Sequence, residues 1–450
     1  MTDFNPSNCE IIKAVIITHA KDKSSDINAI IGKINFSQSI ASSSWSGSAV
    51  IYDTTGFLES FPLRGEEQLN LKLKSNDLNY EVNLKTQIYK IDNVSTMPNN
   101  GGVVYTIHFV SKASYESGKR SITKSYKDLT ASTIAKEIFK EYYTKYSPSN
   151  DKESLPYDTI KYNISGDNNK GRRLYVQPTN GYLRVVVPSY VTSKAMKFIA
   201  TKSYSVNAPS SSYRFFETFD SYFFVTDEFL IKSAINNKKV INLFYDTFIS
   251  LDPKMALDQI RTIETFSNPD RVNVGSDISN GGYRNTIMEI DYVRRKINEN
   301  QFDFTKDAKY IDTTGNQSKI SSDIHTKQFI DDTFNEENAK TAIIFKDYSQ
   351  EGDIPSNLRA DQYYSEIISR RISQQHHMNS ISIDIGLKGR LDITAGNIIN
   401  IKASKFSGSS DKERNQQLSG NYLVHTINHD IDKGVLTTSA KLIKYDWSTD

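Results

Sequence analysis

The sequence predicts a mainly β protein of the α+β class. Runs in which apolar and polar residues alternate occur near both ends of the chain, as expected of half-buried strands. Between them, apolar residues recur at helical spacing. At 450 residues the chain also exceeds a typical domain of roughly 100 to 150 residues, so we expect two to four compact units.

The first β-unit is predicted between residues 35 and 115. Three alternating runs mark its strands: Leu69, Leu71 and Leu73; Tyr80, Val82 and Leu84; and Val103, Tyr105, Ile107 and Phe109. Burying such an apolar face stabilises by roughly 1.5 to 3 kcal/mol per large side chain, so the strands should close into a barrel or sandwich. Their polar faces remain free to meet solvent or a lumen.

Helices are predicted in the middle of the chain. Residues 129–143 carry apolar side chains at helical spacing, with Thr130 or Ser132 available as the N-cap. Residues 188–202 repeat the pattern and lead into two aromatic-rich runs within 213–225. The short polar break between these runs predicts a hairpin, whose dense aromatic side chains should be buried.

The rest of the chain alternates between polar and strand-like segments. Residues 252–305 mix strand-like runs with turns, and residues 312–357 are markedly polar, which indicates an exposed insertion. A helix is expected over 358–377, with Asn357 as its cap. A second β-unit then closes the chain through four runs: residues 381–385, 399–401, 422–427 and 435–442.

Composition excludes several classes of function. Lys+Arg 55 against Asp+Glu 53 gives a net charge of +2, too balanced for a chain that mainly grips phosphate. The single cysteine, Cys9, excludes an internal disulfide and a zinc site built on several thiolates. No stretch approaches the roughly 20 apolar residues of a membrane span. We therefore expect synthesis and assembly in a cytoplasm.

Motifs for metal or nucleotide chemistry are missing from the sequence. His376 and His377 are adjacent on a predicted helix, where successive side chains diverge. His425 and His429 share a strand face but are roughly 13 Å apart, too far to hold one metal. Residues 166–171 contain glycines without the strand–glycine–helix context that cradles phosphate.

Nucleophilic and glycosidase sites have no better support. Ser42, Ser43 and Ser44 are typical of a polar strand face or loop, and no Gly-x-Ser-x-Gly elbow occurs. Glu66 and Glu67 are neighbours of the kind that any chain with 53 acidic residues contains, whereas a glycosidase dyad is defined in space. We predict no catalytic, cofactor-binding or metal-binding residue and no cofactor.

The order of segments resembles the baseplate hub proteins of T4-like contractile-tailed phages, and more distantly the hub portions of other contractile injection systems. At the N-terminal end the resemblance rests on residues 37–52, 54–57 and 62–71, which look like a long hairpin, a turn and a Gly-Glu step into an alternating strand. At the C-terminal end it rests on four segments: residues 364–375, 380–386, 391–401 and 420–424. The resemblance does not extend to the polar stretch 312–357, for which we place no counterpart.

The resemblance implies a domain plan with two tube-like antiparallel β-barrel domains. The first would span residues 1–115, and a helix-containing middle domain 116–212. The second tube-like domain would combine residues 213–250 and 378–450. Residues 251–377 would be an inserted α+β region that contains the polar loop and a helix.

The resemblance also implies a homotrimer, whose ring adapts a sixfold tail tube to a threefold cell-puncturing spike and leaves a channel for DNA. Its partners would be the spike, the tube or tube-initiator protein, baseplate wedge proteins and the tape measure protein, all in the tail baseplate of a virion. Two alternatives belong to other classes: a cell-wall-degrading tail enzyme, and a glycan-binding, adhesin-like β-protein favoured by the tyrosine content. An activity assay would distinguish the cell-wall-degrading enzyme from a structural protein. The predicted middle helices count against the glycan-binding protein.

Overall fold

The computed structural model describes most of the 450-residue chain. The described residues are 7–18, 23–61, 63–75, 80–97, 101–143, 159–162, 172–205, 211–245, 260–270, 279–303, 340–346, 364–379, 381–404, 415 and 418–444.

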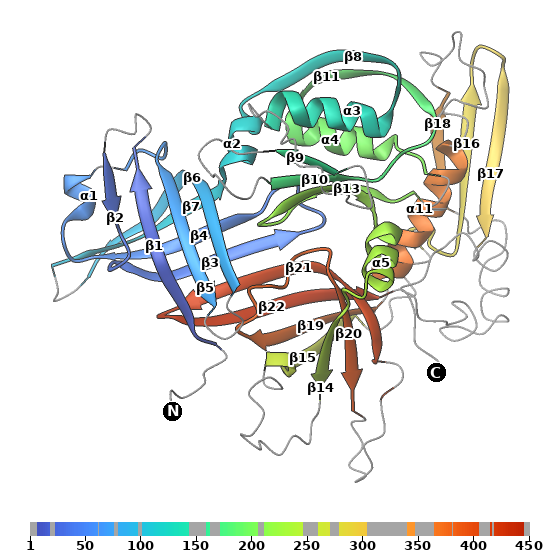
Figure 1. The fold of residues 1–450 in the computed structure, drawn as a ribbon. Helices are drawn as coiled ribbons and strands as arrows, with labels where there is room; N and C mark the ends of the chain where they lie inside the picture. The colour runs from blue at the N-terminus through green and yellow to red at the C-terminus, as the bar shows by residue number, and fades with distance from the viewer. Residues whose placement is uncertain are drawn as a thin grey trace.

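Strands dominate the described residues, as the alternating sequence predicts (Figure 1). The strands of the N-terminal half are β1 (Cys9–Ile17), β2 (Ser24–Asp26), β3 (Ile31–Ser39), β4 (Ser46–Asp53), β5 (Gln68–Ser75), β6 (Tyr80–Thr96), β7 (Val103–Ser111), β8 (Ser121–Thr130), β9 (Thr159–Tyr162), β10 (Arg172–Val176), β11 (Tyr182–Val191), β12 (Tyr213–Glu217) and β13 (Ser221–Thr226). Those of the C-terminal half are β14 (Ile241–Tyr245), β15 (Ile263–Asp270), β16 (Arg284–Asp291), β17 (Lys296–Asp303), β18 (Lys340–Phe345), β19 (Ile381–Lys388), β20 (Ile398–Ala403), β21 (Gly420–Asp432) and β22 (Val435–Lys444).

The helices are fewer and mostly short. They are α1 (Phe57–Ser60), α2 (Lys112–Gly118), α3 (Ala131–Ile138), the π-helix η1 (Phe139–Tyr143), α4 (Thr192–Thr201), α5 (Asp227–Asn236) and α11 (Tyr364–Asn379). No helix of the described chain is both long enough and apolar enough to cross a bilayer.

One large sheet of thirteen strands contains both predicted β-units. Its main path runs β15-β19-β22-β21-β3-β4-β7-β6-β5-β1-β2, with β20 beside β21 and β14 beside β20. Nearly all neighbours are antiparallel; β14 and β20 are parallel. The mainly β class is therefore confirmed, whereas no pairing among the described strands closes this path into a barrel.

The first β-unit packs as its alternation predicts. Leu69, Leu71 and Leu73 are at most 2% exposed, and they point from β5 into a core with Phe36 and Tyr105. The intervening polar residues of β5 are only partly buried. This unit begins earlier than residue 35, because β1 pairs with β5 over nearly its whole length.

The middle region places a pair of helices between two small sheets (Figure 1). Helices α3 and α4 lie side by side, covered by the β8–β11 pair and resting on the sheet β12-β13-β10-β9. Thr130 is the N-cap of α3, as predicted: its side chain accepts a hydrogen bond from the Thr133 N–H. Helix α4 begins at Thr192 rather than 188, because the extended strand β11 continues to Val191.

The predicted aromatic hairpin is present as β12 and β13, and it contacts two cores. Phe215 and Phe224 face the helices α3 and α4, while Phe216 and Val225 join the core of the second β-unit. Helix α5 follows directly, with Thr226 as its N-cap. The hairpin strands thus lie in the middle sheet, with one face against the second β-unit. The division of the chain into domains at residue 213 stays a prediction.

A separate three-stranded sheet, in the order β17-β16-β18, lies at one side of the molecule beside α11 (Figure 1). Strand β18 lies within the segment 312–357 that was expected to be an exposed insertion, and it pairs in parallel with β16. Apart from Lys346, the rest of that segment lies outside the described residues. The predicted helix over 358–377 corresponds to α11, which is described from Tyr364.

Candidate functional site

The two β-units are joined edge to edge by strands β3 and β21. Along one edge, the first half of β21 pairs with β20 and its second half pairs with β3, from Thr426 opposite Ser39 to Asp432 opposite Lys33. The other edge of β21 pairs with β22. Strand β21 therefore belongs to both units and fixes their relative orientation by backbone hydrogen bonds.

An aromatic cluster packs beneath this junction. Phe36 of β3 and Trp45, which precedes β4, are fully buried and contact Phe219, the residue at the turn of the aromatic hairpin. Their ring centroids are 5.4 to 6.2 Å apart in edge-on arrangements, the geometry that aromatic quadrupoles favour. The middle region thus fills the core under the seam between the β-units.

His429 of β21 completes this cluster. Its ring lies 5.7 Å from the Phe219 ring, and Nδ1 is 3.2 Å from the Thr438 hydroxyl. Burial lowers the pKa of His429 to about 4, and burial likewise lowers the pKa of His425 to about 4. Both side chains are therefore neutral near pH 7 and act as packing groups.

The opposite face of the same sheet is lined by short polar side chains. Residues that alternate with the buried ones on β3 and β21 point to this face. In register, one row consists of Ser439, Asn428, Ser37 and Ser46, and the next of Thr437, Asp430, Asn35, Ser48 and His108. We call these two rows the polar face; it crosses the junction without interruption.

Charges on and beside the polar face balance one another. Lys33 and Asp430 form an ion pair of 2.7 Å across the junction, and their hydrogen bond raises the pKa of Lys33. Asp92 pairs with Lys90 and His108, and the hydrogen bond from Lys90 lowers the pKa of Asp92. The residues registered along these strands include five lysines (33, 90, 388, 441 and 444) and four aspartates (92, 384, 430 and 432), so their formal charge is nearly balanced.

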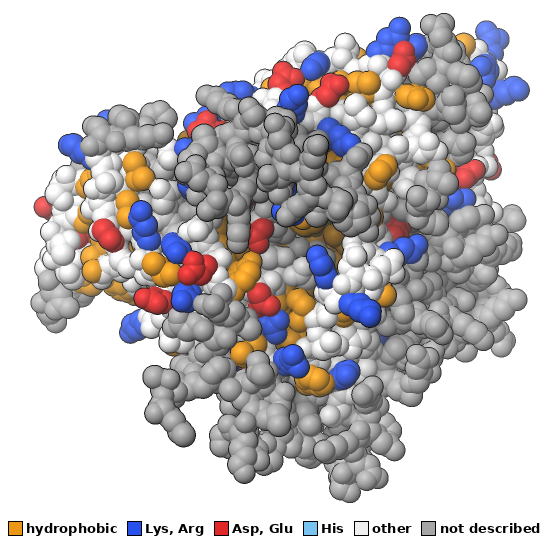
Figure 2. Space-filling view, viewed as in Figure 1, with side chains coloured by type: hydrophobic (Ala, Val, Ile, Leu, Met, Phe, Trp, Pro, Cys, Tyr) orange, Lys and Arg blue, Asp and Glu red, His pale blue; other side chains and the backbone are white. Residues whose placement is uncertain are grey.

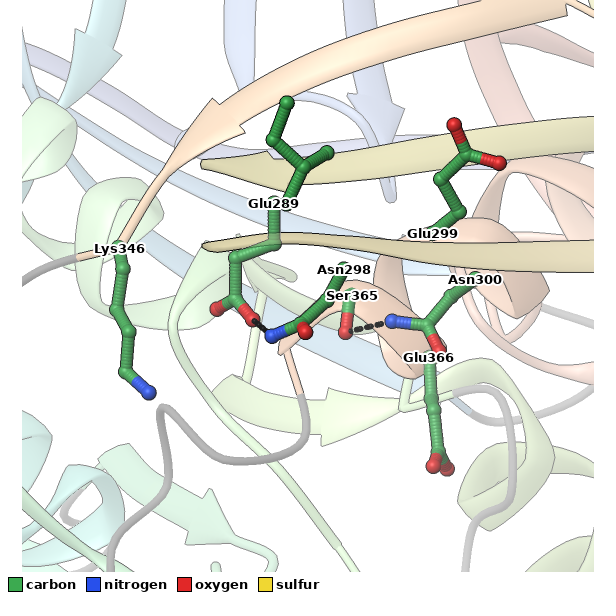
Figure 3. A pocket seen from close by; sticks show the side chains of 8 residues that line it. Glu289, Asn298, Glu299, Asn300, Lys346, Ser365 and Glu366 are labelled. Atoms are coloured by element: carbon green, nitrogen blue, oxygen red, sulfur yellow. Dashed lines mark hydrogen bonds between the residues drawn. The ribbon is translucent and has the colours of Figure 1, made fainter. Parts of the chain in front are cut away.

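A second feature is a polar pocket of 510 Å³ between the three-stranded sheet and α11 (Figure 3). In Figure 3 the side chains of Glu289 and Asn298 are hydrogen-bonded below the strands, as are Asn300 and Ser365, while Glu299 points to the other side. Lys346 also lines the pocket, and its Nζ lies 3.8 Å from the Asp291 carboxylate. The Asn300–Ser365 hydrogen bond ties the sheet to the helix, whereas the Glu289–Asn298 bond joins β16 to β17.

Sequence-selected residues take structural positions where the structure describes them. The carboxylate of Glu67 accepts hydrogen bonds from the N–H groups of Arg64 and Gly65, which holds the turn before β5. Ser42 to Ser44 form a turn between β3 and β4. His376 and His377 lie on α11, and residues 166–171 lie outside the described residues.

Across the described ranges no group of three or more His, Cys, Asp or Glu side chains is arranged to hold a metal ion. The expectation that the chain has no catalytic or cofactor site stays a prediction. Sequence reasoning missed the β3–β21 junction, although both strands carry the same alternation of short polar and large apolar residues: Asn35, Ser37 and Ser39 on one, and Thr426, Asn428 and Asp430 on the other.

Comparison with known proteins gives a match in fold. No protein-family model matches the chain, and no curated protein is significantly similar in sequence. The tail protein of Neisseria meningitidis MC58 is 10% identical, covers 97% of this chain and 98% of its own, and superposes with a TM-score of 0.50. The 43 kDa tail protein of prophage MuSo2 from Shewanella oneidensis is 9% identical, with coverages of 97% and 99% and a TM-score of 0.52. The chain therefore shares its fold with these tail proteins over nearly its whole length.

Proposed function

We propose that this chain is a structural baseplate hub subunit of a contractile phage tail. The observation that carries the proposal is the junction of two β-units in one sheet, with a continuous polar face on one side and a closed apolar core on the other. The shared fold with phage tail proteins supports it.

In the proposed assembly three copies form a ring. Each copy contributes two β-units, so three copies present six quasi-equivalent positions around one axis. Such a ring can meet a sixfold tail tube, or its initiator, on one side and a threefold spike on the other. Wedge proteins and the tape measure protein are further partners in this proposal, and the place of action is the baseplate of the virion after assembly in the host cytoplasm.

The polar face is the proposed lining of the channel. DNA binds proteins mainly through its phosphates, and each Lys or Arg contact adds affinity that must be released before the DNA can move. A lining of serine, threonine and asparagine, with its charges paired, is well hydrated and produces only a weak net electrostatic field. Such a surface lets DNA pass without specific binding.

The proposed role is structural rather than catalytic. In the described residues, the Glu67 carboxylate and Ser42, which could suggest an enzyme, make hydrogen bonds within turns instead. No observation favours the cell-wall hydrolase or the glycan-binding reading. A purified chain that cleaved peptidoglycan, and lost this activity through one point substitution, would overturn the structural proposal.

The decisive experiment expresses the chain alone and together with its neighbouring spike gene. Light scattering then gives the mass, and electron microscopy the symmetry, of each product. A ring of three copies that co-purifies with the spike is the expected result. The design allows for a hub that needs its spike in order to trimerise. A strict monomer in both samples, without bound spike, would contradict the proposal.

A further inference from the structure

The three-stranded sheet has one covered and one uncovered face. Its inner face contacts α11: the Asn285 side chain donates to the Ser369 carbonyl at 3.1 Å, and Ile287 is fully buried. By alternation, the residues between these point outward. We call the following six the outer face: Met288 and Ile290 of β16, Ile297 and Glu299 of β17, and Ile343 and Phe345 of β18.

The outer face is unusually apolar for an exposed surface. Phe345 is 69% exposed and Ile297 is 64% exposed, the two highest values among the large apolar side chains described. Thirteen such side chains are exposed in the described chain, and five of them belong to this small sheet and its β16–β17 turn: Tyr292, Val293, Ile297, Ile343 and Phe345. A cluster of this kind is typical of a protein interaction surface.

Charges of opposite sign flank the apolar residues. Arg295 and Lys296 are exposed at the β16–β17 turn, where Figure 2 shows Lys and Arg side chains at the upper right. Glu299 lies on the outer face, farther along β17. Neither Arg295 nor Glu299 has an ion-pair partner among the residues that the structure describes.

The spacing of these residues makes the surface complementary to itself. Ile297 lies midway between Arg295 and Glu299 in the sequence, and it pairs in register with Ile290, which pairs with Phe345. A twofold axis along this row would stack each of the three apolar residues on its own copy. The same axis would bring the β16–β17 turn, in which Arg295 has a left-handed backbone (φ 51°), close to Glu299 of the second copy, and the reverse.

We propose that the outer face binds the outer face of a second copy of this chain, with the strands of the two sheets antiparallel. Sheets pack face to face at about 10 Å, so the apolar row fills the interface and the two ion pairs close its ends. The same axis brings Tyr292, the turn residue that follows β16, toward Met288 of the second copy.

This contact goes beyond the proposed hub function. It uses a sheet at the side of the molecule, whereas the proposed channel lining lies across β3 and β21. A twofold contact pairs two copies and closes on itself, so it does not by itself give an open fibre. The contact can therefore be tested whether or not the ring forms.

Cysteine cross-linking tests the symmetry directly, because the only native cysteine, Cys9, is 1% exposed. With a short bis-maleimide, Ile297→Cys alone should give covalent dimers, since the two thiols meet at the axis. Arg295→Cys alone and Glu299→Cys alone should stay monomeric, whereas a mixture of these two variants should give a heterodimer. Val186→Cys, at an exposed site on β11, is the control and should not cross-link.

Charge exchange supplies the second test. Arg295→Glu and Glu299→Arg should each lower the cross-linking yield of Ile297→Cys several-fold, and the two changes together should restore it. High salt should lower the yield of the parent variant as the ion pairs are screened.

Two outcomes would overturn the twofold contact. One is the absence of cross-linking in Ile297→Cys, and the other is a yield from Arg295→Cys alone as high as that from the mixture. Light scattering of the unmodified chain with its spike measures the ring separately, so a trimer without this cross-link would refute the twofold contact and leave the hub proposal intact.

Discussion

Phe219, at the turn of the β12–β13 hairpin, packs edge-on against Trp45 of the first β-unit, with ring centroids 5.4 Å apart and planes at 80°. Both side chains are buried. This contact inserts the middle region into the core beneath the β3–β21 junction. Phe219 therefore connects three parts of the chain that are far apart in sequence.

Replacement of Phe219 by alanine should destabilise the protein by about 3 to 5 kcal/mol, because it removes a buried ring and leaves a cavity. Urea unfolding followed by tryptophan fluorescence measures the change, since Trp45 is one of two tryptophans. Tyr182→Ala is the matched control: Tyr182 is 41% exposed, and surface changes usually stay within about 0.5 kcal/mol. Equal effects of the two substitutions would refute the role given to Phe219.

Leu71→Asp should prevent folding rather than remove one specific function. Leu71 is 2% exposed in the centre of β5, and an unpaired carboxylate at that position should cost several kcal/mol. Asn70→Asp, one residue away on the other face of the strand, should remain soluble. Circular dichroism and soluble yield distinguish the two variants, and a folded Leu71→Asp protein would show that the strand faces are assigned wrongly.

Alternation of apolar and polar residues was sufficient to predict most strands of both β-units. Leu69, Leu71 and Leu73 are buried as predicted, and so are Ile381, Ile383 and Ile385. Such local patterns report which face of a strand is buried. They could not report that β21 pairs with β3, because that contact joins residues nearly 400 positions apart and depends on how both units pack.

Helix boundaries were less predictable than helix existence. The N-cap Thr130 marked α3 correctly, whereas α4 starts four residues later than expected because Tyr182–Val191 is extended and pairs with β8. Helix α5 was missed: it follows the aromatic hairpin directly, and its start depends on the cap supplied by Thr226. The polar face could not be predicted, because it depends on the register between strands, and a single sequence does not reveal that register.

Stability should fall as the pH is lowered from about 6.5 toward 4. Burial lowers the pKa of His429 from 6.5 to about 4, so between these values the unfolded chain binds more protons than the folded one. A shift of this size corresponds to about 3 kcal/mol, fully lost near pH 4. Urea unfolding at several pH values measures the slope.

The variant His429→Gln isolates this effect. It removes the titrating group while keeping a polar side chain near the Thr438 hydroxyl, so the slope between pH 6.5 and 4 should become shallower. His425, whose pKa is lowered in the same direction by burial, should account for part of the slope that remains. An unchanged slope would mean that His429 is not buried in its neutral form.

The polar face offers the most direct test of the proposed channel. Lysines in place of Asn35, Ser37 and Asn428 add three positive charges at partly exposed positions, so folding should be preserved. In tails that carry this triple variant, DNA leaving the capsid should be retarded, because each new cation adds an electrostatic contact to phosphate. Added salt should relieve the delay, because about three more phosphate contacts make the binding of DNA to the lining more dependent on salt concentration.

Three lysines on the β8–β11 pair, in place of Thr123, Val186 and Ser189, provide the control and should leave ejection unchanged. Ejection from purified particles is followed by the fluorescence of a DNA-binding dye. Equal rates for wild type and the polar-face variant would show that this face does not line the path of DNA.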